Sequence, residues 1–263
     1  MISEKMFSSY YELYDKWQTI PTFNWQDWTQ RSFPKERIEN AIECISSLDY
    51  DFTKNLTLLD LACENGLYSI PACSKFKKVI GIDNDEFAIK KANITKEHYS
   101  NQGFNTNNLE FKNIGFWEYG LGEKFLGQEG VKWDFHKPEF RDEFLDLFKN
   151  SILEADNINA VLVCEFLNFI DDNGVKFFKR ILENLKLIII QTKYLTVEQW
   201  LHSPDDYSRY SGNYEDGLSN SFNLYSQSGI VSLLEEFNFS ISYHNKNSNS
   251  GLVIGINNDF NIS

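Results

Sequence analysis

The sequence predicts an α/β fold built on a mostly parallel sheet. Two apolar runs, Leu56–Leu59 and Val79–Ile82, end in Asp60 and Asp83, and a tight turn and a helical stretch separate them. A strand, turn, helix and strand in this order form the repeating unit of parallel sheets. A further run at 187–190 is apolar at every position, which is typical of a strand buried on both faces.

Both aspartates stand at the carboxyl end of a predicted strand, where open α/β sheets bind their ligands. An acid about 20 residues beyond the first turn commonly binds a ribose diol, and Asp83 has this spacing from Asp60. The turn keeps a single glycine, Gly66, and adds the acid Glu64, whereas a phosphate site favours several glycines. We therefore expect a cationic nucleoside, of which S-adenosylmethionine, a sulfonium, is the common example.

Three segments carry a resemblance to a known family. Residues 58–69 (LLDLACENGLYS) resemble motif I of the class I S-adenosylmethionine-dependent methyltransferases, and residues 79–83 (VIGID) resemble motif II. Residues 160–170 are similar to the fourth strand and the hydrophobic segment after it. The resemblance implies a Rossmann-like, seven-stranded, mostly parallel sheet with helices on both faces, and S-adenosylmethionine as the cofactor.

Motif I of this family reads Asp-x-Gly-x-Gly-x-Gly, and Ala62 and Glu64 stand here at two of its glycine positions. The resemblance also implies that Asn113, at the end of the third strand, reaches the adenine amino group. The cofactor-binding residues that we expect are Asp60, Ala62, Cys63, Glu64, Gly66, Asp83, Asn84, Phe87, Asn113 and Glu165.

The length of 263 residues fits a single domain, 1–263, with additions. We expect an N-terminal helical cap over 1–50 and a substrate-lid insertion over 114–157, between strands three and four. The four cysteines show no pairing pattern or histidine cluster, so we expect reduced thiols and no metal site. No long apolar segment is present, which predicts a cytoplasmic protein without a membrane span.

The net charge of −13 argues against nucleic acid as a partner, because binding to its backbone needs a basic face. A local basic patch remains an alternative, although a solvated surface is the simpler interpretation of the same lysines. Its members would be Lys75, Lys77, Lys78, Lys90 and Lys91.

The N-terminal segment is rich in aromatic residues. Phe7, Tyr10, Tyr11 and Tyr14 have the spacing of one helix face and predict a first helix that packs as a cap. Pro34 is expected to begin the next helix, which continues to Ile45.

The remaining elements follow from hydrophobic pattern. Helices are expected over 87–98, 138–153, 174–185 and 228–237, and strands over 109–112, from about 158, and over 187–192, 239–243 and 251–256. The last two strands form a hairpin around 245–250, and residues 200–217 form a polar, turn-rich loop.

Transfer of the sulfonium methyl group to an oxygen needs a general base, most often histidine or a carboxylate. His136, His202 and Glu165 are the catalytic candidates, with Asp134 and Asp205 as alternates. A surface or core role for either histidine is the simpler alternative. A divalent metal between the two histidines has no supporting ligand spacing.

We expect O-methylation of a small polar metabolite, a sugar or sugar nucleotide first. Two alternatives remain: a methyl or carboxymethyl transferase of the tRNA wobble-uridine type, and a noncatalytic partner that keeps the nucleoside site. An ordinary Rossmann-like domain with another ligand is the simplest competing interpretation.

Overall fold

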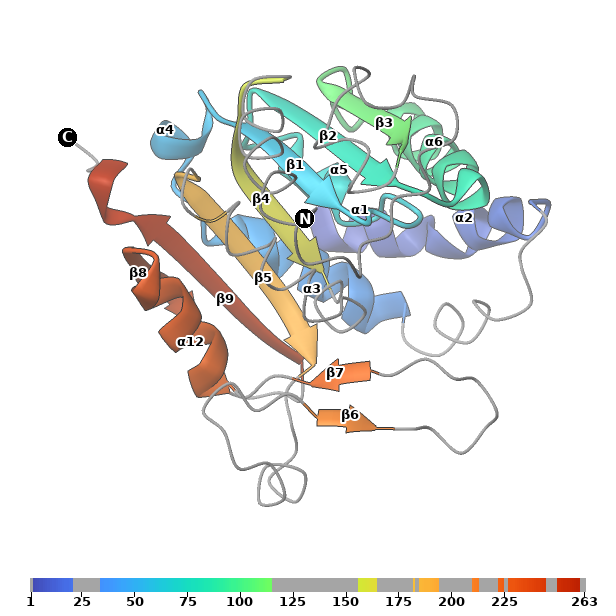
Figure 1. Cartoon of the computed structure of the whole chain (residues 1–263). Helices are drawn as coiled ribbons and strands as arrows, with labels where there is room; N and C mark the ends of the chain where they lie inside the picture. The colour runs from blue at the N-terminus through green and yellow to red at the C-terminus, as the bar shows by residue number, and fades with distance from the viewer. Residues whose placement is uncertain are drawn as a thin grey trace, which may run out of the picture. The chain divides into compact units, whose positions relative to one another are not determined.

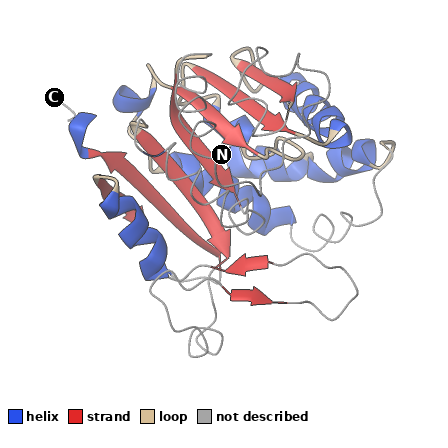
Figure 2. Cartoon of the chain, in the orientation of Figure 1, coloured by secondary structure: helices blue, strands red, loops and turns tan. Residues whose placement is uncertain are grey.

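The computed structural model describes residues 2–20, 34–114, 156–164, 182, 185–193, 210–212, 222–224, 227–244 and 250–260. The chain divides into two compact units, residues 1–116 and 117–263. Figure 1 labels the elements of each unit, and Figure 2 shows which of them are helices and which are strands. The prediction of a single domain over 1–263 stays a prediction.

The first unit contains a parallel sheet with the order β3-β2-β1. Asp60 of β1 lies opposite Gly81 of β2, and Asp83 of β2 lies opposite Asn113 of β3. Because the strands are parallel, their carboxyl ends meet at one edge of the sheet. The bounds of the elements are α1 Ile2–Ser8, α2 Tyr10–Trp17, α3 Pro34–Ser46, α4 Tyr50–Thr53, β1 Thr57–Leu61, α5 Ser69–Ala72, β2 Lys78–Asp83, α6 Glu86–Asn101 and β3 Leu109–Asn113.

The two long helices of this unit, α3 and α6, begin at residues that favour a helix start. Pro34 opens α3, and Ile38, Ala41 and Ile45 on one face of that helix are buried. The side chain of Asp85 caps α6 by accepting a 2.8 Å hydrogen bond from the Phe87 backbone N–H. All five residues of β1 are buried, as expected for a strand covered on both faces.

The predicted aromatic face of a single first helix is wrong. The chain forms two helices, α1 and α2, and Ser9 separates them. Tyr10 and Tyr14 are buried, but Phe7 and Tyr11 are 36% and 60% exposed. The buried face of α2 consists of Tyr10, Leu13, Tyr14 and Trp17. The break at Ser9 restarts the helical period, so Phe7 and Tyr10 do not share a face.

The second unit holds β4, β5, β9 and β8, in this order. β4 and β5 are parallel, whereas β9 is antiparallel to both β5 and β8, which confirms the predicted hairpin. Gly255 of β9 lies against Leu234 of α12 and Phe239 of β8, which lets the helix approach the sheet closely. The bounds are β4 Ile158–Cys164, β5 Leu187–Lys193, β6 Tyr210–Gly212, β7 Phe222–Leu224, α12 Gln227–Glu236, β8 Phe239–His244, β9 Ser250–Asn257 and the 3₁₀ helix η2 Asn258–Phe260.

The expected loop over 200–217 contains a strand that the sequence analysis missed. Residues 210–212 form β6, which pairs antiparallel with β7, and Tyr210 lies opposite Leu224. Three-residue strands give almost no periodic signal, because alternation needs at least four positions. The insertion at 114–157 and the helices expected at 138–153 and 174–185 lie almost entirely outside the described residues.

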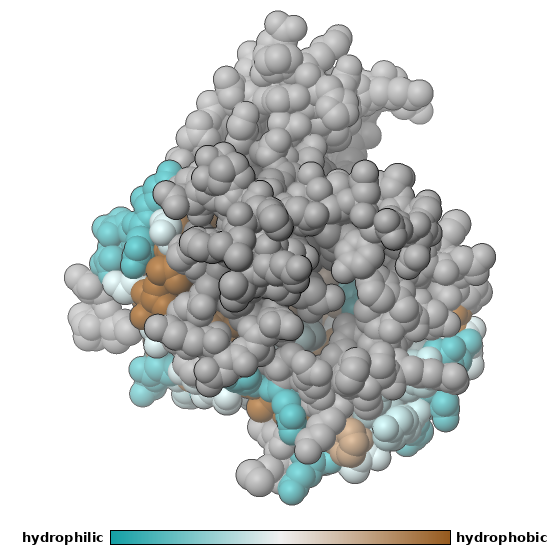
Figure 3. Space-filling model, turned by 90° about the horizontal axis from the view of Figure 1, so that it is seen from below, coloured by the Kyte–Doolittle hydropathy of each residue, from teal (hydrophilic) through white to brown (hydrophobic). Residues whose placement is uncertain are grey.

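The seven strands predicted for the Rossmann-like sheet are all present, three in the first unit and four in the second. Figure 3 shows one face, on which the coloured residues are mainly hydrophilic with small hydrophobic patches. In the described part of the chain, no helix has the length and apolar character needed to cross a membrane.

Candidate functional site

The candidate site is the edge of the first unit where β1, β2 and β3 end. Asp60 lies near the end of β1, residues 62–66 form a tight loop after it, and Asp83 and Asn113 end the two neighbouring strands. The parallel register therefore gathers the predicted motif I and motif II residues at one place.

The loop after β1 has an unusual backbone. Ala62, Glu64 and Gly66 all have positive φ, of 53°, 50° and 73°. These are the three positions at which motif I of the family has glycine. A residue with a β-carbon pays about 1–2 kcal/mol to adopt this left-handed conformation. The loop geometry that the motif predicts is present even though alanine and glutamate replace two of its glycines.

Hydrogen bonds fix this loop to the end of β2. The Cys63 backbone N–H donates to the Ile82 carbonyl at 2.9 Å, and the Gly66 N–H donates to the Cys63 carbonyl at 2.8 Å. The Asn65 side chain closes the turn by accepting from the Leu67 N–H at 3.2 Å. The loop is therefore preorganised by its own backbone and by β2.

Asp83 connects the loop to the next helix. Its Oδ2 accepts a 3.0 Å hydrogen bond from the Glu64 backbone N–H, and its Oδ1 accepts a 2.9 Å bond from the Asp85 N–H. Burial raises the pKa of Asp83, and the nearby charges of Glu64 and Asp85 act in the same direction. The carboxylate is thus oriented by backbone donors in a site that lacks a positive counter-charge among its described contacts.

Asp60 is almost completely buried, with 1% of its surface exposed. Its Oδ2 accepts a 2.5 Å hydrogen bond from the hydroxyl of Ser69 in the first turn of α5. Burial, with a smaller contribution from the charge of Asp83, raises the pKa of Asp60 to about 7. A neighbouring cation would favour the ionised form and reverse part of this shift.

The ring of Phe111 on β3 packs against the loop at Gly66 and against Gly81 of β2. A β-carbon added at Gly66 or at Gly81 would collide with this ring, and at Gly81 also with the Cys63 sulfur. Cys63 is buried, and burial raises the pKa of its thiol well above the usual range, so it acts as a packing residue. Glycine at these two positions lets loop, strand and ring pack in direct contact.

The other predicted cofactor residues lie around the same edge. Asn84 and Asn113 are exposed, and the Asn113 amide donates to the Asp83 backbone carbonyl at 3.1 Å. This bond engages the Nδ2 of Asn113 and thereby fixes the orientation of its carboxamide group. Phe87 is half-buried at the start of α6, and the Lys90 ammonium lies 5.1 Å from its ring centroid.

The predicted catalytic residues His136, His202 and Glu165 lie outside the described residues, as do their alternates Asp134 and Asp205. Glu165 was also a cofactor candidate, and its role stays a prediction. Among the described residues, no group of three His, Cys, Asp or Glu side chains could hold a metal ion. All four cysteines are among the described residues, and none of them forms a disulfide bond.

Sequence reasoning missed three contributors to the site: Ser69, Asn65 and Phe111. Ser69 has a sequence signal, because it is the polar residue on the first helical turn after the loop. Asn65 is 2% exposed, and its Nδ2 has no hydrogen-bond partner in the described part of the chain. An unpaired buried donor is costly, and it marks this loop as able to accept a further polar contact.

The donor set fits a cationic nucleoside such as S-adenosylmethionine. Two buried or half-buried carboxylates, Asp60 and Asp83, suit a sulfonium, and the carboxylate of Asp83 suits a ribose diol. A pyrophosphate would meet these acids and a loop with one glycine, which disfavours it. The orphaned amide of Asn65 lies in the same loop.

The sequence matches no protein-family model and no curated protein. The N-terminal domain of EvdMO1 with SAH bound has a TM-score of 0.51 at 15% identity, and the match covers 98% of each chain. The magnesium protoporphyrin IX methyltransferase (ChlM) from Synechocystis PCC 6803 with bound SAH has a TM-score of 0.54 at 12% identity, over 97% of this chain and 98% of that one. These likenesses show that the chain has the fold of these proteins, as the motifs predict.

Proposed function

We propose that the protein is an S-adenosylmethionine-dependent methyltransferase. The observation that carries this proposal is the left-handed loop 62–66, which is bound to Asp83 at the carboxyl edge of β1 and β2. The acidic donor set at this edge supports a cationic nucleoside. The shared fold with structures that hold SAM or SAH supports the same cofactor.

Within this proposal, each described residue has a role. Asp83 binds the ribose hydroxyls, Asn113 contacts the adenine edge, and the loop 62–66 surrounds the methionine portion. Asp60, buried beneath the loop, supplies negative charge under the sulfonium. The bound cofactor would supply an activated methyl group, so the chain's main task is to align the acceptor with it.

We propose a small polar acceptor, with a sugar or sugar-nucleotide hydroxyl as the first choice. The net charge of −13 favours a small molecule over a nucleic acid. The N-terminal domain of EvdMO1, which shares the fold at a TM-score of 0.51 and 15% identity, was crystallised in the presence of SAH and D-fucose. His136, His202 and Glu165 are the proposed bases for a hydroxyl acceptor.

The tRNA wobble-uridine alternative needs a basic surface, and the lysines considered for it are largely engaged. The Lys78 and Lys90 ammonium groups pair with Glu110 and Glu86 at 3.3 and 2.5 Å. Lys91 is buried, and the Lys75 ammonium donates to the Leu48 carbonyl at 2.7 Å. These contacts favour the small-molecule acceptor. The noncatalytic alternative keeps the cofactor site, so only turnover separates it from an enzyme.

Calorimetric titration with S-adenosylmethionine and S-adenosylhomocysteine tests the proposal. We expect the wild type to bind both ligands, Asp83→Ala to lose binding, and Asn113→Ala to weaken it. Asn113 is exposed, so its variant should fold normally even if the Asp83 variant loosens the loop. Glu110→Gln, on the exposed side of β3, is the matched control and should bind as the wild type does.

The absence of binding to the folded wild type would refute the methyltransferase proposal. Binding without methyl transfer to any sugar, sugar nucleotide or tRNA would support the noncatalytic alternative instead. If binding is found, variants of His136 and His202 should lower turnover without changing cofactor affinity, because they would act on the acceptor.

A further inference from the structure

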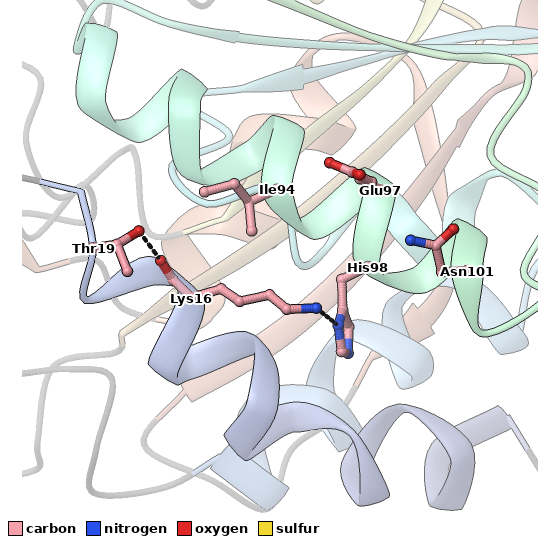
Figure 4. Close-up of a pocket in the computed structure, with 6 residues that line it drawn as sticks. All are labelled: Lys16, Thr19, Ile94, Glu97, His98 and Asn101. Carbon is pink, nitrogen blue, oxygen red and sulfur yellow. Dashed lines mark hydrogen bonds between the residues drawn. The ribbon is translucent and has the colours of Figure 1, made fainter.

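A second cluster of titratable groups lies on the first unit, where α2 packs on α6. A pocket of about 250 Å³ lies between these helices. Figure 4 shows the Lys16 side chain reaching from α2 to the His98 ring on α6. The residues that line the pocket are Lys16, Thr19, Ile94, Glu97, His98 and Asn101.

The Lys16 side chain approaches one ring nitrogen of His98 within hydrogen-bond distance. The Lys16 Nζ lies 3.2 Å from the His98 Nδ1. A lysine ammonium has only donors, so Nδ1 must be the acceptor and carries no proton. A hydrogen bond from the Lys16 ammonium to Nδ1 therefore requires a neutral imidazole with its proton on Nε2.

His98 is buried, and its second ring nitrogen, Nε2, does not take part in the contact with Lys16. Only 2% of the residue is exposed, and Nε2 has no hydrogen-bond partner among the described residues. Burial and the Lys16 charge lower the pKa of His98, while the Glu12 carboxylate and the Ser9 backbone oppose them more weakly. Glu97 lines the same pocket, and the Tyr99 ring is in edge contact with the imidazole, with 5.1 Å between the ring centroids.

Glu12 offers a second arrangement of the same three side chains. Its Oε1 lies 2.8 Å from the Lys16 Nζ and 3.9 Å from the His98 Nδ1. Both α2 side chains are partly exposed, at 45% for Lys16 and 60% for Glu12. The imidazole is buried, whereas its two candidate partners on α2 reach the solvent.

We propose that Glu12, Lys16 and His98 form a pH-sensitive latch between α2 and α6. In the closed state, neutral His98 accepts a hydrogen bond from Lys16. When Nδ1 takes a proton from solvent, the ring becomes an imidazolium, repels the Lys16 ammonium and donates to Glu12 instead. The Lys16 ammonium then remains paired with Glu12 or turns to solvent.

The sign of the effect follows from the lowered pKa of His98. When α2 is not docked, the His98 imidazole is hydrated and binds a proton more readily than it does when α2 is docked. The latch is therefore closed at neutral and higher pH and weakens as the pH falls below the usual histidine range. The remaining α2 contacts, including the bonds from the Trp17 indole N–H to Thr95 and Lys91, then hold the helix alone.

Nitrogen NMR of the full chain tests the tautomer and the coupling together. We expect an Nε2–H tautomer for His98 near pH 8 and a midpoint below the ordinary histidine value. Lys16→Met should raise that midpoint, because it removes the repelling charge, and Glu12→Gln should lower it. Lys90→Met breaks a similar i,i+4 pair on α6 and should leave the midpoint unchanged.

Hydrogen exchange of the α2 amides tests whether the helix responds. After correction for intrinsic exchange, protection in the wild type should fall by up to about tenfold per pH unit below the unperturbed histidine pKa. In His98→Asn the carboxamide oxygen can still accept from Lys16 without titrating, so protection should become independent of pH.

An Nδ1–H tautomer, pKa shifts of the same sign in both charge variants, or pH-independent protection of α2 in the wild type would each overturn the latch. None of these measurements uses the cofactor, so the inference stands or fails separately from the proposed methyltransferase activity.

Discussion

Oδ2 of Asp83 accepts a hydrogen bond from the Glu64 backbone N–H, and this contact joins the loop after β1 to the end of β2, 19 residues further along the chain. The donor belongs to a residue with φ of 50°, in the left-handed region that glycine adopts at little cost. The bond therefore holds Glu64 in a costly conformation and aims the carboxylate of Asp83 at the edge of the sheet. The expected consequences follow from these contacts.

Replacing Glu64 with glycine should stabilise the protein. The left-handed conformation costs a residue with a β-carbon about 1–2 kcal/mol, and the extra freedom of glycine in the unfolded chain cancels about half of this gain. We expect the free energy of unfolding in urea to rise by about 0.5–1 kcal/mol. Asn157→Gly is the matched control, because asparagine tolerates its φ of 59° and should gain less. A loss of stability in Glu64→Gly would show that the glutamate side chain contributes more than its backbone costs.

Gly81→Ala should destabilise the protein through Phe111. The new β-carbon would meet the Phe111 ring and the Cys63 sulfur, and overpacking of this kind costs about 1–3 kcal/mol. Unfolding in urea of Gly81→Ala, Phe111→Leu and the double variant gives the coupling between the two positions. We expect the double variant to be more stable than the sum of the single changes predicts. Strict additivity would contradict the contact.

The contribution of Asp60 to the stability of the protein should decrease as the pH rises from about 4 to about 7, the interval between its ordinary and its native pKa. In this interval the native state binds more protons than the unfolded state, so ionisation of the buried carboxyl favours unfolding. Asp60→Asn should flatten this part of the curve of unfolding free energy against pH. A wild-type curve that rises over the same interval would show that other groups dominate.

Binding of a cationic cofactor should release protons near pH 7. The cation lowers the raised pKa of Asp60, so the carboxyl ionises as the ligand binds. Titrations of S-adenosylmethionine in two buffers with different ionisation enthalpies measure the proton release directly. S-adenosylhomocysteine, which lacks the sulfonium charge, is the matched ligand and should release fewer protons. Equal release by both ligands would place the titrating group elsewhere.

Trp17→Phe should weaken the docking of α2 on α6. The indole N–H donates to the Thr95 hydroxyl at 3.1 Å and to the Lys91 carbonyl at 3.3 Å, and the ring is fully buried. Loss of a buried donor and part of a ring should cost about 1–3 kcal/mol in the free energy of unfolding. Tyr11→Phe is the control on the same helix, because Tyr11 is exposed and its change should be near zero. A similar loss in both variants would argue against a specific role for the indole.

The strands and their polar ends were predictable because their signals are local. Asp60 and Asp83 directly follow apolar runs, and a parallel arrangement brings such strand ends together whatever else the chain does. Periodicity predicted the bounds of α3, α12 and the final hairpin to within one residue, whereas α6 continues to Asn101, beyond its predicted end at His98. The N-terminal helices were predicted less well. The spacing of the aromatic residues does not reveal the break at Ser9, and this break changes which of them are buried.

The sequence by itself determined that this chain is an α/β protein whose strands end in acids at a loop with the motif I pattern. Only the tertiary structure decided that Ser69 binds Asp60, that Phe111 supports Gly66 and Gly81, and that Lys16 meets His98. The physical reason is the range of the interactions. Hydrophobic period and turn chemistry act between near neighbours, whereas hydrogen-bond partners and pKa shifts depend on side chains that folding brings together from distant positions.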